Sequence, residues 1–303
     1  HVITDDSALG GAEIERSFRF NDDDSAYLQR QPSSNTSGSS QKITISFWIK
    51  LGNIPSGTNG GTFFGTSGDN HRGQFFNQEF YFGNANYWIN TTALVRDLSS
   101  WYHVVYVVDT TQGTTSNRQK IYVNGVLQDR GDTISDPSQN ATFDYFNNSS
   151  QTYYIGRRQS GNYFDGYLAE IHFIDGYAYD ASYFGYTEQQ TGIWRHKKVT
   201  GITYGTNGFY LDFSDNSSIT NICLDKSGNA NNFSPDNCST EDSMLDTPTN
   251  VFCTQSPLDD DYTSVSTFSQ GNLFASRGSS NHGSNRGTIG MSSGKWYFEY
   301  CLP

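Results

Sequence analysis

A strict alternation of side chains between residues 42 and 50 constrains the fold of this chain more than any other feature. The segment reads KITISFWIK, and large apolar residues occupy every second position. Successive side chains of a β-strand point to opposite faces, so the alternation predicts a strand with one face in a core. The predicted inward side chains are Ile43, Ile45, Phe47 and Ile49, and the predicted outward ones are Thr44, Ser46 and Trp48.

Other short apolar runs are separated by clusters of Asn, Ser, Thr and Gly, without a sustained helical period. Many short strands joined by polar turns are typical of an all-β sandwich or barrel. The pair Asn124-Gly125 predicts a type I′ hairpin turn, because both residues accept the positive φ that this turn requires. The most apolar run, residues 101–109, is expected to cross the core. Its predicted inward side chains are Trp101, His103, Val105 and Val107.

The formal net charge of −12 argues against a nucleic-acid-binding protein. Such a protein needs a basic face that displaces counterions from phosphates, and the densest basic group here is only residues 195–198. No apolar run has the length of a membrane-spanning helix, so membrane insertion is not expected. The spacing of the cysteines does not fit a zinc site, and it leaves open a Cys223–Cys238 disulfide or free thiols. The four cysteines are Cys223, Cys238, Cys253 and Cys301.

Residues 164–176, FDGYLAEIHFIDG, place a carboxylate and a histidine two positions apart. Alternation puts Glu170, His172 and Ile174 on one face of a strand, which raises the question of a catalytic strand in a sugar-cleaving enzyme. The simpler interpretation is a sandwich strand on which Glu170 and His172 form a surface pair. The side chains that then pack inward are Tyr167, Ala169, Ile171 and Phe173.

Six segments occur in an order that resembles the laminin-G-like modules of the concanavalin A-like lectin/glucanase superfamily. They are SFRFNDDDSAYL, ITISFWIK, WYHVVYVVD, KIYVNGVL, YYIGR and FDGYLAEIHFIDGYAYD. The variant looks most like the modules found in large structural proteins of marine bacteriophages. The resemblance implies a concanavalin A-like jelly-roll sandwich over residues 1–185. A connector with short strands is then expected over residues 186–262.

The segment SSGKWYFEY near the C-terminal end resembles the first strand of a SPRY domain. It predicts a strand over residues 294–300 and the start of a second β domain over residues 263–303. Such an aromatic strand needs a partner, which it could find in this chain, in a following domain or in a neighbouring subunit. Because the chain begins with His1 and stops just after this run, we expect it to be part of a longer polypeptide.

Glycan-cleaving relatives in this superfamily carry a strand similar to Glu-x-Asp-x-x-Glu, with two glutamates for retaining hydrolysis. Here the face of Glu170 offers Ile174 in place of a second carboxylate. The resemblance therefore implies a non-enzymatic structural and adhesion protein on a phage particle, as a fibre, spike or decoration component. Its implied partners are other virion proteins and host-surface glycans, and a homo-oligomer is expected. The alternatives are a glycan-cleaving depolymerase and a secreted cellular lectin.

Three further groups are candidate binding residues. Asn86, Tyr87 and Trp88 follow a Gly- and Asn-rich approach, and aromatic rings stack on sugars while amides bind hydroxyls. Asp22, Asp23 and Asp24 crowd one turn, where calcium would relieve their repulsion. The segment from Asp225 to Asp236 imitates an EF-hand loop, but Ala230 replaces the glycine that such a loop needs.

Overall fold

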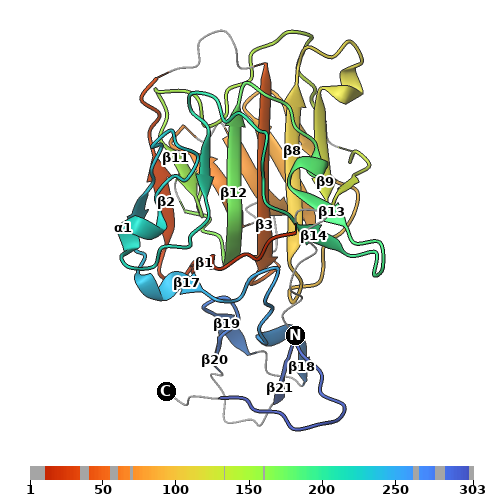
Figure 1. Ribbon diagram of the computed structural model, residues 1–303, viewed down its shortest axis with the longest axis vertical. Helices are drawn as coiled ribbons and strands as arrows, with labels where there is room; N and C mark the ends of the chain where they lie inside the picture. The colour runs from red at the N-terminus through yellow and green to blue at the C-terminus, as the bar shows by residue number, and fades with distance from the viewer. Residues whose placement is uncertain are drawn as a thin grey trace.

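The protein is a sandwich of two antiparallel β-sheets with an additional layer on one side (Figure 1). The computed structural model describes residues 11–34, 41–54, 61–68, 71–132, 134–159, 161–261, 266–276 and 284–299. Among these residues, helix is restricted to one short segment, α1 (Ile219–Ile222), and to single turns over Thr115–Asn117, Ala181–Tyr183 and Thr240–Asp242. The architecture confirms the all-β jelly-roll prediction.

The larger sheet has eight strands, seven of them in one path and β15 paired to the side of β12. In spatial order they are β10 (Val126–Leu127), β9 (Gln119–Val123), β8 (Tyr102–Asp109), β3 (Lys42–Leu51), β12 (Gly166–Asp175), β1 (Ser17–Phe20) and β17 (Ser243–Met244), with β15 (Phe209–Leu211) beside β12.

The smaller sheet has seven strands, and it faces the larger one across the core. Its order is β16 (Ser234–Asp236), β2 (Tyr27–Arg30), β11 (Tyr153–Ile155), β4 (Thr62–Thr66), β5 (His71–Phe76), β6 (Glu79–Asn84) and β7 (Trp88–Asn90).

The core between the sheets is rich in aromatic rings. Ile43, Ile45, Phe47 and Ile49 of β3 all point into it, as their alternation predicts. Phe47 packs edge-on against Phe64 of the opposite sheet at a centroid distance of 5.0 Å. The turn between β9 and β10 has φ values of 47° at Asn124 and 79° at Gly125, which confirms the predicted hairpin.

The outer face of the eight-stranded sheet is also buried, which the sequence interpretation did not include. Residues 177–204 cross this face, and their β13 (Gly185–Thr187) and β14 (Trp194–His196) form a hairpin in front of it (Figure 1). Val105 packs here beside Val107 and Phe184, away from the sandwich core. The four residues predicted to point inward from residues 101–109 do share one face, but it is this covered outer face. The core side chains of that strand are Val104, Tyr106 and Val108.

A β-bulge in β12 corrects the predicted facing of that strand. The pairing of β12 with β3 shifts between Ala169 and His172, so two residues occupy the space of one. Ile171 and Phe173 point into the core as predicted. Tyr167 and Ala169 instead face the covered outer side, where they pack against Trp48 and Trp101.

Residues 186–262, predicted as a connector, contribute two strands to the larger sheet and one to the smaller sheet. β15 pairs with β12, β17 pairs with β1, and β16 extends the smaller sheet beside β2. Lys50 is 1% exposed and forms an ion pair of 2.7 Å with Asp246, so a buried charge pair ties this segment to the sandwich. The thiols of Cys223, Cys238 and Cys253 are free, and Cys301 lies outside the described residues.

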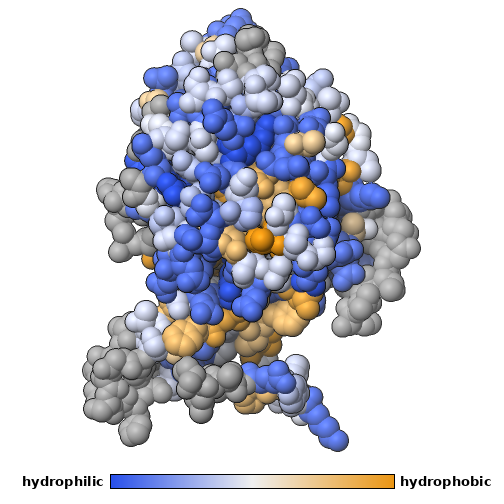
Figure 2. All heavy atoms as spheres, turned by 90° about the vertical axis from the view of Figure 1, so that its left-hand side faces the viewer, coloured by the Kyte–Doolittle hydropathy of each residue, from blue (hydrophilic) through white to orange (hydrophobic). Residues whose placement is uncertain are grey.

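Two small two-stranded sheets follow below the sandwich in Figure 1. One pairs β18 (Gln255–Asp261) with β21 (Ser284–Gly287), and the other is the hairpin of β19 (Thr267–Ser269) and β20 (Phe274–Ser276). Figure 2 shows apolar side chains gathered where this part meets the sandwich. The predicted strand over residues 294–300 is wrong for 294–299, which form no strand, and Tyr297 is 82% exposed. The physical reason is that no strand of the described chain pairs with this segment. No helix in the described ranges is long and apolar enough to span a membrane.

Candidate functional site

Glu170 lies at the bulge of β12 with a positive φ of 49°, which is rare for a non-glycine residue. The bulge turns its side chain toward the covered outer face, where it is 7% exposed. The Tyr210 hydroxyl donates a hydrogen bond of 2.7 Å to Glu170 Oε2. His172 Nε2 and His196 Nε2 lie 3.8 and 3.7 Å from the same oxygen. The predicted surface pair of Glu170 and His172 is therefore a buried cluster, closed by residues that follow β12 in the chain.

Nδ1 of His172 and both ring nitrogens of the neighbouring His103 have defined partners. His172 Nδ1 lies 2.8 Å from the Tyr204 hydroxyl. The Trp194 indole donates to His103 Nδ1 at 3.0 Å, so the proton of a neutral His103 is on Nε2 and is donated to Ser46 Oγ at 2.9 Å. These contacts join the β13–β14 hairpin to β3 and β8 through polar groups.

Burial and charge act in opposite directions on the ionisation of the cluster. Burial alone would raise the pKa of Glu170, but His172, His196 and Tyr210 together hold that pKa below its usual value. Burial lowers the pKa of His196 against the attraction of the Glu170 carboxylate. The pKa of His103 is held well below 6.5 by burial, and the neighbouring imidazoles add to this effect. At neutral pH the cluster thus holds one carboxylate and neutral His103.

This arrangement does not support glycoside hydrolysis. A retaining enzyme needs two carboxyl groups about 5–5.5 Å apart on either side of an accessible sugar. Ile174 is buried among apolar side chains on the same side of β12 and supplies no carboxylate. The space between Glu170, the histidines and Phe184 has no room for a water molecule, so a sugar cannot enter it.

The buried histidines make stability depend on pH, which gives a first prediction. The pKa values of His71, His103 and His196 are lowered in the folded state, that of His71 to about 4. Below pH 6.5 the unfolded chain therefore binds more protons, and stability falls as the pH falls toward 4. We expect the denaturant midpoint to decrease steadily between pH 7 and pH 4.5.

The carboxyl of Asp165 works against this trend and provides the control. Burial raises the pKa of Asp165 to about 7, so its folded state binds a proton that the unfolded chain has lost, which favours folding at lower pH. Asp165→Asn should therefore steepen the loss of stability on acidification. A midpoint that rises between pH 7 and pH 4.5 would contradict the burial of neutral imidazoles.

The three aspartates predicted to hold calcium lie in the turn between β1 and β2. The amide of Ser25 donates to the Asp22 carbonyl at 3.0 Å, and the Asn21 side chain donates to Asp24 Oδ2 at 2.6 Å. Burial, and next the charge of Asp23, raise the pKa of Asp22. Within the described ranges, no group of three or more acidic, histidine or cysteine side chains is arranged to hold a metal ion. Calcium at this turn stays a prediction.

The loop that imitates an EF-hand has structural partners for its oxygens. The Asp225 carboxylate accepts hydrogen bonds from the backbone of Tyr210, Ser227 and Asn231. The Asn231 amide oxygen accepts from Arg30 at 2.5 Å. This loop is therefore a hydrogen-bonded turn in which the oxygens of Asp225 and Asn231 already have donors.

The predicted glycan-binding residues at β7 point in different directions. Tyr87 stacks on Phe143 at 6.2 Å and packs against the core. Ile89 points into the core, so its neighbour Trp88 points away from it on the outer face of the seven-stranded sheet. Asn86 is exposed beside it, and Asn84 Oδ1 accepts hydrogen bonds from the Asn86 and Tyr87 amides at 3.0 and 2.9 Å.

Trp88 shares this outer face with side chains that the sequence analysis did not single out. Cross-strand pairing aligns Trp88 of β7, Gly83 of β6 and Arg72 of β5 in one row. A Cβ atom at Gly83 would lie 2.6 Å from Trp88 Cβ, so only glycine fits beneath the tryptophan. The next row contains Asn90 and Tyr81, and both are half-buried. An indole, a phenol, an amide and a guanidinium thus lie together on an open sheet face, which is the mixture that binds sugars.

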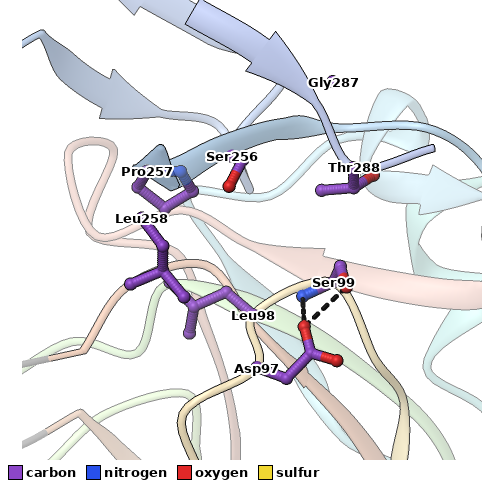
Figure 3. Close-up of a pocket in the computed structure, with 8 residues that line it drawn as sticks. All are labelled: Asp97, Leu98, Ser99, Ser256, Pro257, Leu258, Gly287 and Thr288. Carbon is purple, nitrogen blue, oxygen red and sulfur yellow. Dashed lines mark hydrogen bonds between the residues drawn. The ribbon is translucent and has the colours of Figure 1, made fainter. Parts of the chain in front are cut away.

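A separate pocket of about 160 Å³ lies between residues 97–99 and the paired strands β18 and β21 (Figure 3). Asp97 is its acidic group, and its oxygens accept from the Ser99 amide at 2.8 Å and from the hydroxyls of Ser99 and Ser100 at 2.5 Å. Burial would raise the pKa of Asp97, but these hydrogen bonds lower it. The oxygens of this carboxylate are therefore already engaged by the chain itself.

A family model described as the concanavalin A-like lectin/glucanases superfamily matches residues 22–180, just over half of the 303-residue chain. No curated protein sequence matches the chain. The matching segment contains Trp88 and most of the seven-stranded sheet, together with β3, β8 and β12.

Several solved structures are similar at low sequence identity. A candidate carbohydrate binding protein from Bacteroides ovatus is 18% identical, with 74% of this chain and 59% of that chain covered and a TM-score of 0.48. The heptameric SAP-like pentraxin of Limulus polyphemus is 18% identical, with coverage of 54% and 78% and a TM-score of 0.35. Domain 4 of an extracellular arabinanase from Geobacillus stearothermophilus, in complex with arabinotriose, is 22% identical, with coverage of 48% and 66% and a TM-score of 0.33.

Proposed function

Because the chain belongs to the concanavalin A-like lectin/glucanases superfamily, we propose that it is a non-enzymatic glycan-binding module that binds sugar on the outer face of its seven-stranded sheet. The observation that carries this proposal is the position of Trp88, which is half-buried over Gly83 and flanked by Tyr81 and Asn90. Aromatic faces stack on the C–H surfaces of sugar rings, while amide and guanidinium groups bind the hydroxyls. The face is built on paired strands, so it needs little ordering when a sugar binds.

The proposed absence of catalysis rests on the environment of Glu170. Its carboxylate is enclosed by His172, His196 and Tyr210, without space for water. Trp88 lies on the outer face of the other sheet, so a sugar bound there does not meet this carboxylate. The geometry therefore favours binding over cleavage.

The biological setting of this module is a further part of the proposal. The resemblance to laminin-G-like modules of marine bacteriophage structural proteins supports a place on the surface of a phage particle, as a fibre, spike or decoration component. Other virion proteins and host-surface glycans are then its partners, and the particle holds it as a homo-oligomer. The SPRY-like segment near residue 294 is proposed to begin a following domain.

Trp88→Ala tests the binding surface. The loss of the stacking platform should weaken binding to any polysaccharide that the wild type retains by roughly tenfold or more. Affinity electrophoresis through gels that contain single polysaccharides measures this change directly. The melting temperature should stay close to that of the wild type, since the indole is partly exposed on a sheet edge.

Trp296→Ala is the matched control, because Trp296 is 60% exposed and lies in the C-terminal segment, away from the seven-stranded sheet. This variant should bind as the wild type does. If Trp296→Ala loses binding while Trp88→Ala retains it, the sugar binds to the C-terminal segment and the proposed surface is wrong.

A further inference from the structure

A cluster of three tyrosines surrounds one arginine at the other side of the same outer face. The guanidinium carbon of Arg157 lies 4.3 Å from the ring centroid of Tyr27, 4.5 Å from that of Tyr154 and 5.7 Å from that of Tyr163. Tyr27 is on β2 and Tyr154 is on the neighbouring β11, and their inward neighbours Leu28 and Ile155 are in the core. The tyrosine rings therefore point outward with Arg157 between them.

Arg157 is not paired with a carboxylate, in contrast to five other cations of the described residues. Lys42, Lys50, Arg19, Arg130 and Arg195 each lie within 4 Å of a carboxylate. Arg157 has no carboxylate within that distance among the described residues, although the net charge of the chain is −12. Asp236 lies opposite Tyr27 on the paired strand β16. The pKa of the Tyr27 hydroxyl is raised mainly by burial, and the Asp236 carboxylate raises it further.

The guanidinium is held in place before any ligand arrives. Its Nε donates to the Arg158 carbonyl at 3.0 Å, and its Nη2 donates to the Gln159 carbonyl at 2.5 Å. Together with the three rings, these bonds fix the plane of the group. An arginine has five N–H donors, so further donors remain for an anion, and a fixed guanidinium loses little entropy when it binds one.

We propose that Arg157 and its three tyrosines form a subsite for an anionic substituent, a carboxylate or a sulfate ester, on a glycan bound along the outer face of the seven-stranded sheet. This inference rests on the proposed function and specifies its substrate class. The arginine binds the anion, and the edges of the tyrosine rings and the Gln29 amide border it on paired strands.

The distance between this subsite and Trp88 fits a single extended chain. Tyr154 lies on β11 and Trp88 on β7, and β4, β5 and β6 lie between them. Four strand steps of about 4.8 Å separate the two positions by roughly 19 Å. The backbone of Arg157 and Arg158 passes over Gly65 of β4, and Trp88 lies against Gly83 of β6. Arg72 of β5 is half-buried between these two positions. A glycan that spans this face meets an aromatic platform at one end and a cation at the other.

The test compares three probes in affinity gels: alginate as a polyuronate, dextran sulfate as a sulfated polymer and laminarin as a neutral glucan. The wild type should bind at least one anionic polymer more tightly than laminarin. Arg157→Gln should weaken that binding by roughly 10- to 100-fold and leave binding to laminarin unchanged. The substituent is identified as carboxylate or sulfate by the anionic polymer whose binding Arg157→Gln weakens more.

Two further variants separate a lost ligand contact from a change in fold or net charge. Arg157→Lys keeps the charge among the rings but loses the planar fork, so it should bind anionic polymers with intermediate strength. Lys198→Gln makes the same charge change on the layer that covers the other sheet, where Lys198 is exposed, and should bind as the wild type does. Melting curves confirm that each variant is folded.

The outcomes also distinguish the two proposals. The anionic subsite is overturned, while the glycan-binding face stands, if Arg157→Gln binds all three polymers as the wild type does. The same holds if Lys198→Gln loses as much binding to the anionic polymers as Arg157→Gln does. If Trp88→Ala leaves binding to every polymer unchanged, or the wild type binds none, the binding face fails and the subsite fails with it.

Discussion

Val105→Asp is expected to lower the free energy of unfolding by about 4 kcal/mol, since it places an unpaired charge in an apolar environment. Val105 is 0% exposed on the outer face of β8, where it packs with Ile174 and Phe184 beneath residues 177–204. The aspartate would lose these apolar contacts and gain no positively charged partner in exchange. Chemical denaturation followed by circular dichroism measures the change.

Val126→Asp is the matched control for this prediction. Val126 is 63% exposed on β10 at the edge of the same sheet, so an aspartate there stays in water. Its effect should remain within about 0.5 kcal/mol. Equal stability of Val105→Asp and the wild type would mean that residues 177–204 do not cover the eight-stranded sheet.

Asp246→Ala should destabilise the protein by about 3–5 kcal/mol, because it leaves the ammonium group of Lys50 buried without its counter-charge. Asp246 is 4% exposed, and its Oδ2 lies 2.7 Å from Lys50 Nζ. Its Oδ1 accepts a hydrogen bond of 3.0 Å from the Trp101 indole. One carboxylate thus satisfies a lysine of β3 and a tryptophan next to β8, and it joins the segment after β17 to the larger sheet.

The double variant Lys50→Met with Asp246→Ala separates the cost of an isolated charge from the value of the pair. Replacement of both charges by apolar groups is often close to neutral, so the double variant should recover most of the stability that Asp246→Ala loses. Strictly additive losses in the two single variants and the double variant would show that Lys50 and Asp246 do not interact in the folded protein.

The core between the sheets was predictable because alternation reports which side chains share a face. Ile43, Ile45 and Phe47 point into the core as predicted, and the Asn124-Gly125 turn connects the predicted hairpin. Local signals were sufficient here, because period-two burial and positive φ at Asn-Gly are properties of short segments.

The covered outer face was not predictable from the same signals. Thr44 and Ser46 on one side of β3 are typical of a solvent-exposed face, yet both are buried. The covering layer comes from residues 177–204, which lie more than a hundred residues further along the chain and lack a regular period. The burial of a polar face by such a segment can be predicted only from the tertiary structure.

The candidate sites were likewise predictable where the signal was local and unpredictable where it depended on strand pairing. The missing second carboxylate opposite Glu170 was visible in the sequence, but the bulge that buries Glu170 was not, because it depends on the pairing of β12 with β3. Trp88 was identified as an aromatic near flexible residues. Its neighbours Arg72 and Tyr81 became neighbours only through the registers of β5, β6 and β7. Arg157 was not identified, since its contact with Tyr27 depends on the pairing of β2 with β11.

The central claim is that this module binds glycans without cleaving them, and a single incubation tests it most directly. The purified chain is mixed with each of a panel of polysaccharides, and the retained protein and the released reducing ends are measured in the same sample. The account predicts retention by at least one polysaccharide, with reducing ends at the level of the protein-free control. Reducing ends that accumulate with the wild type and disappear with Glu170→Gln would contradict it.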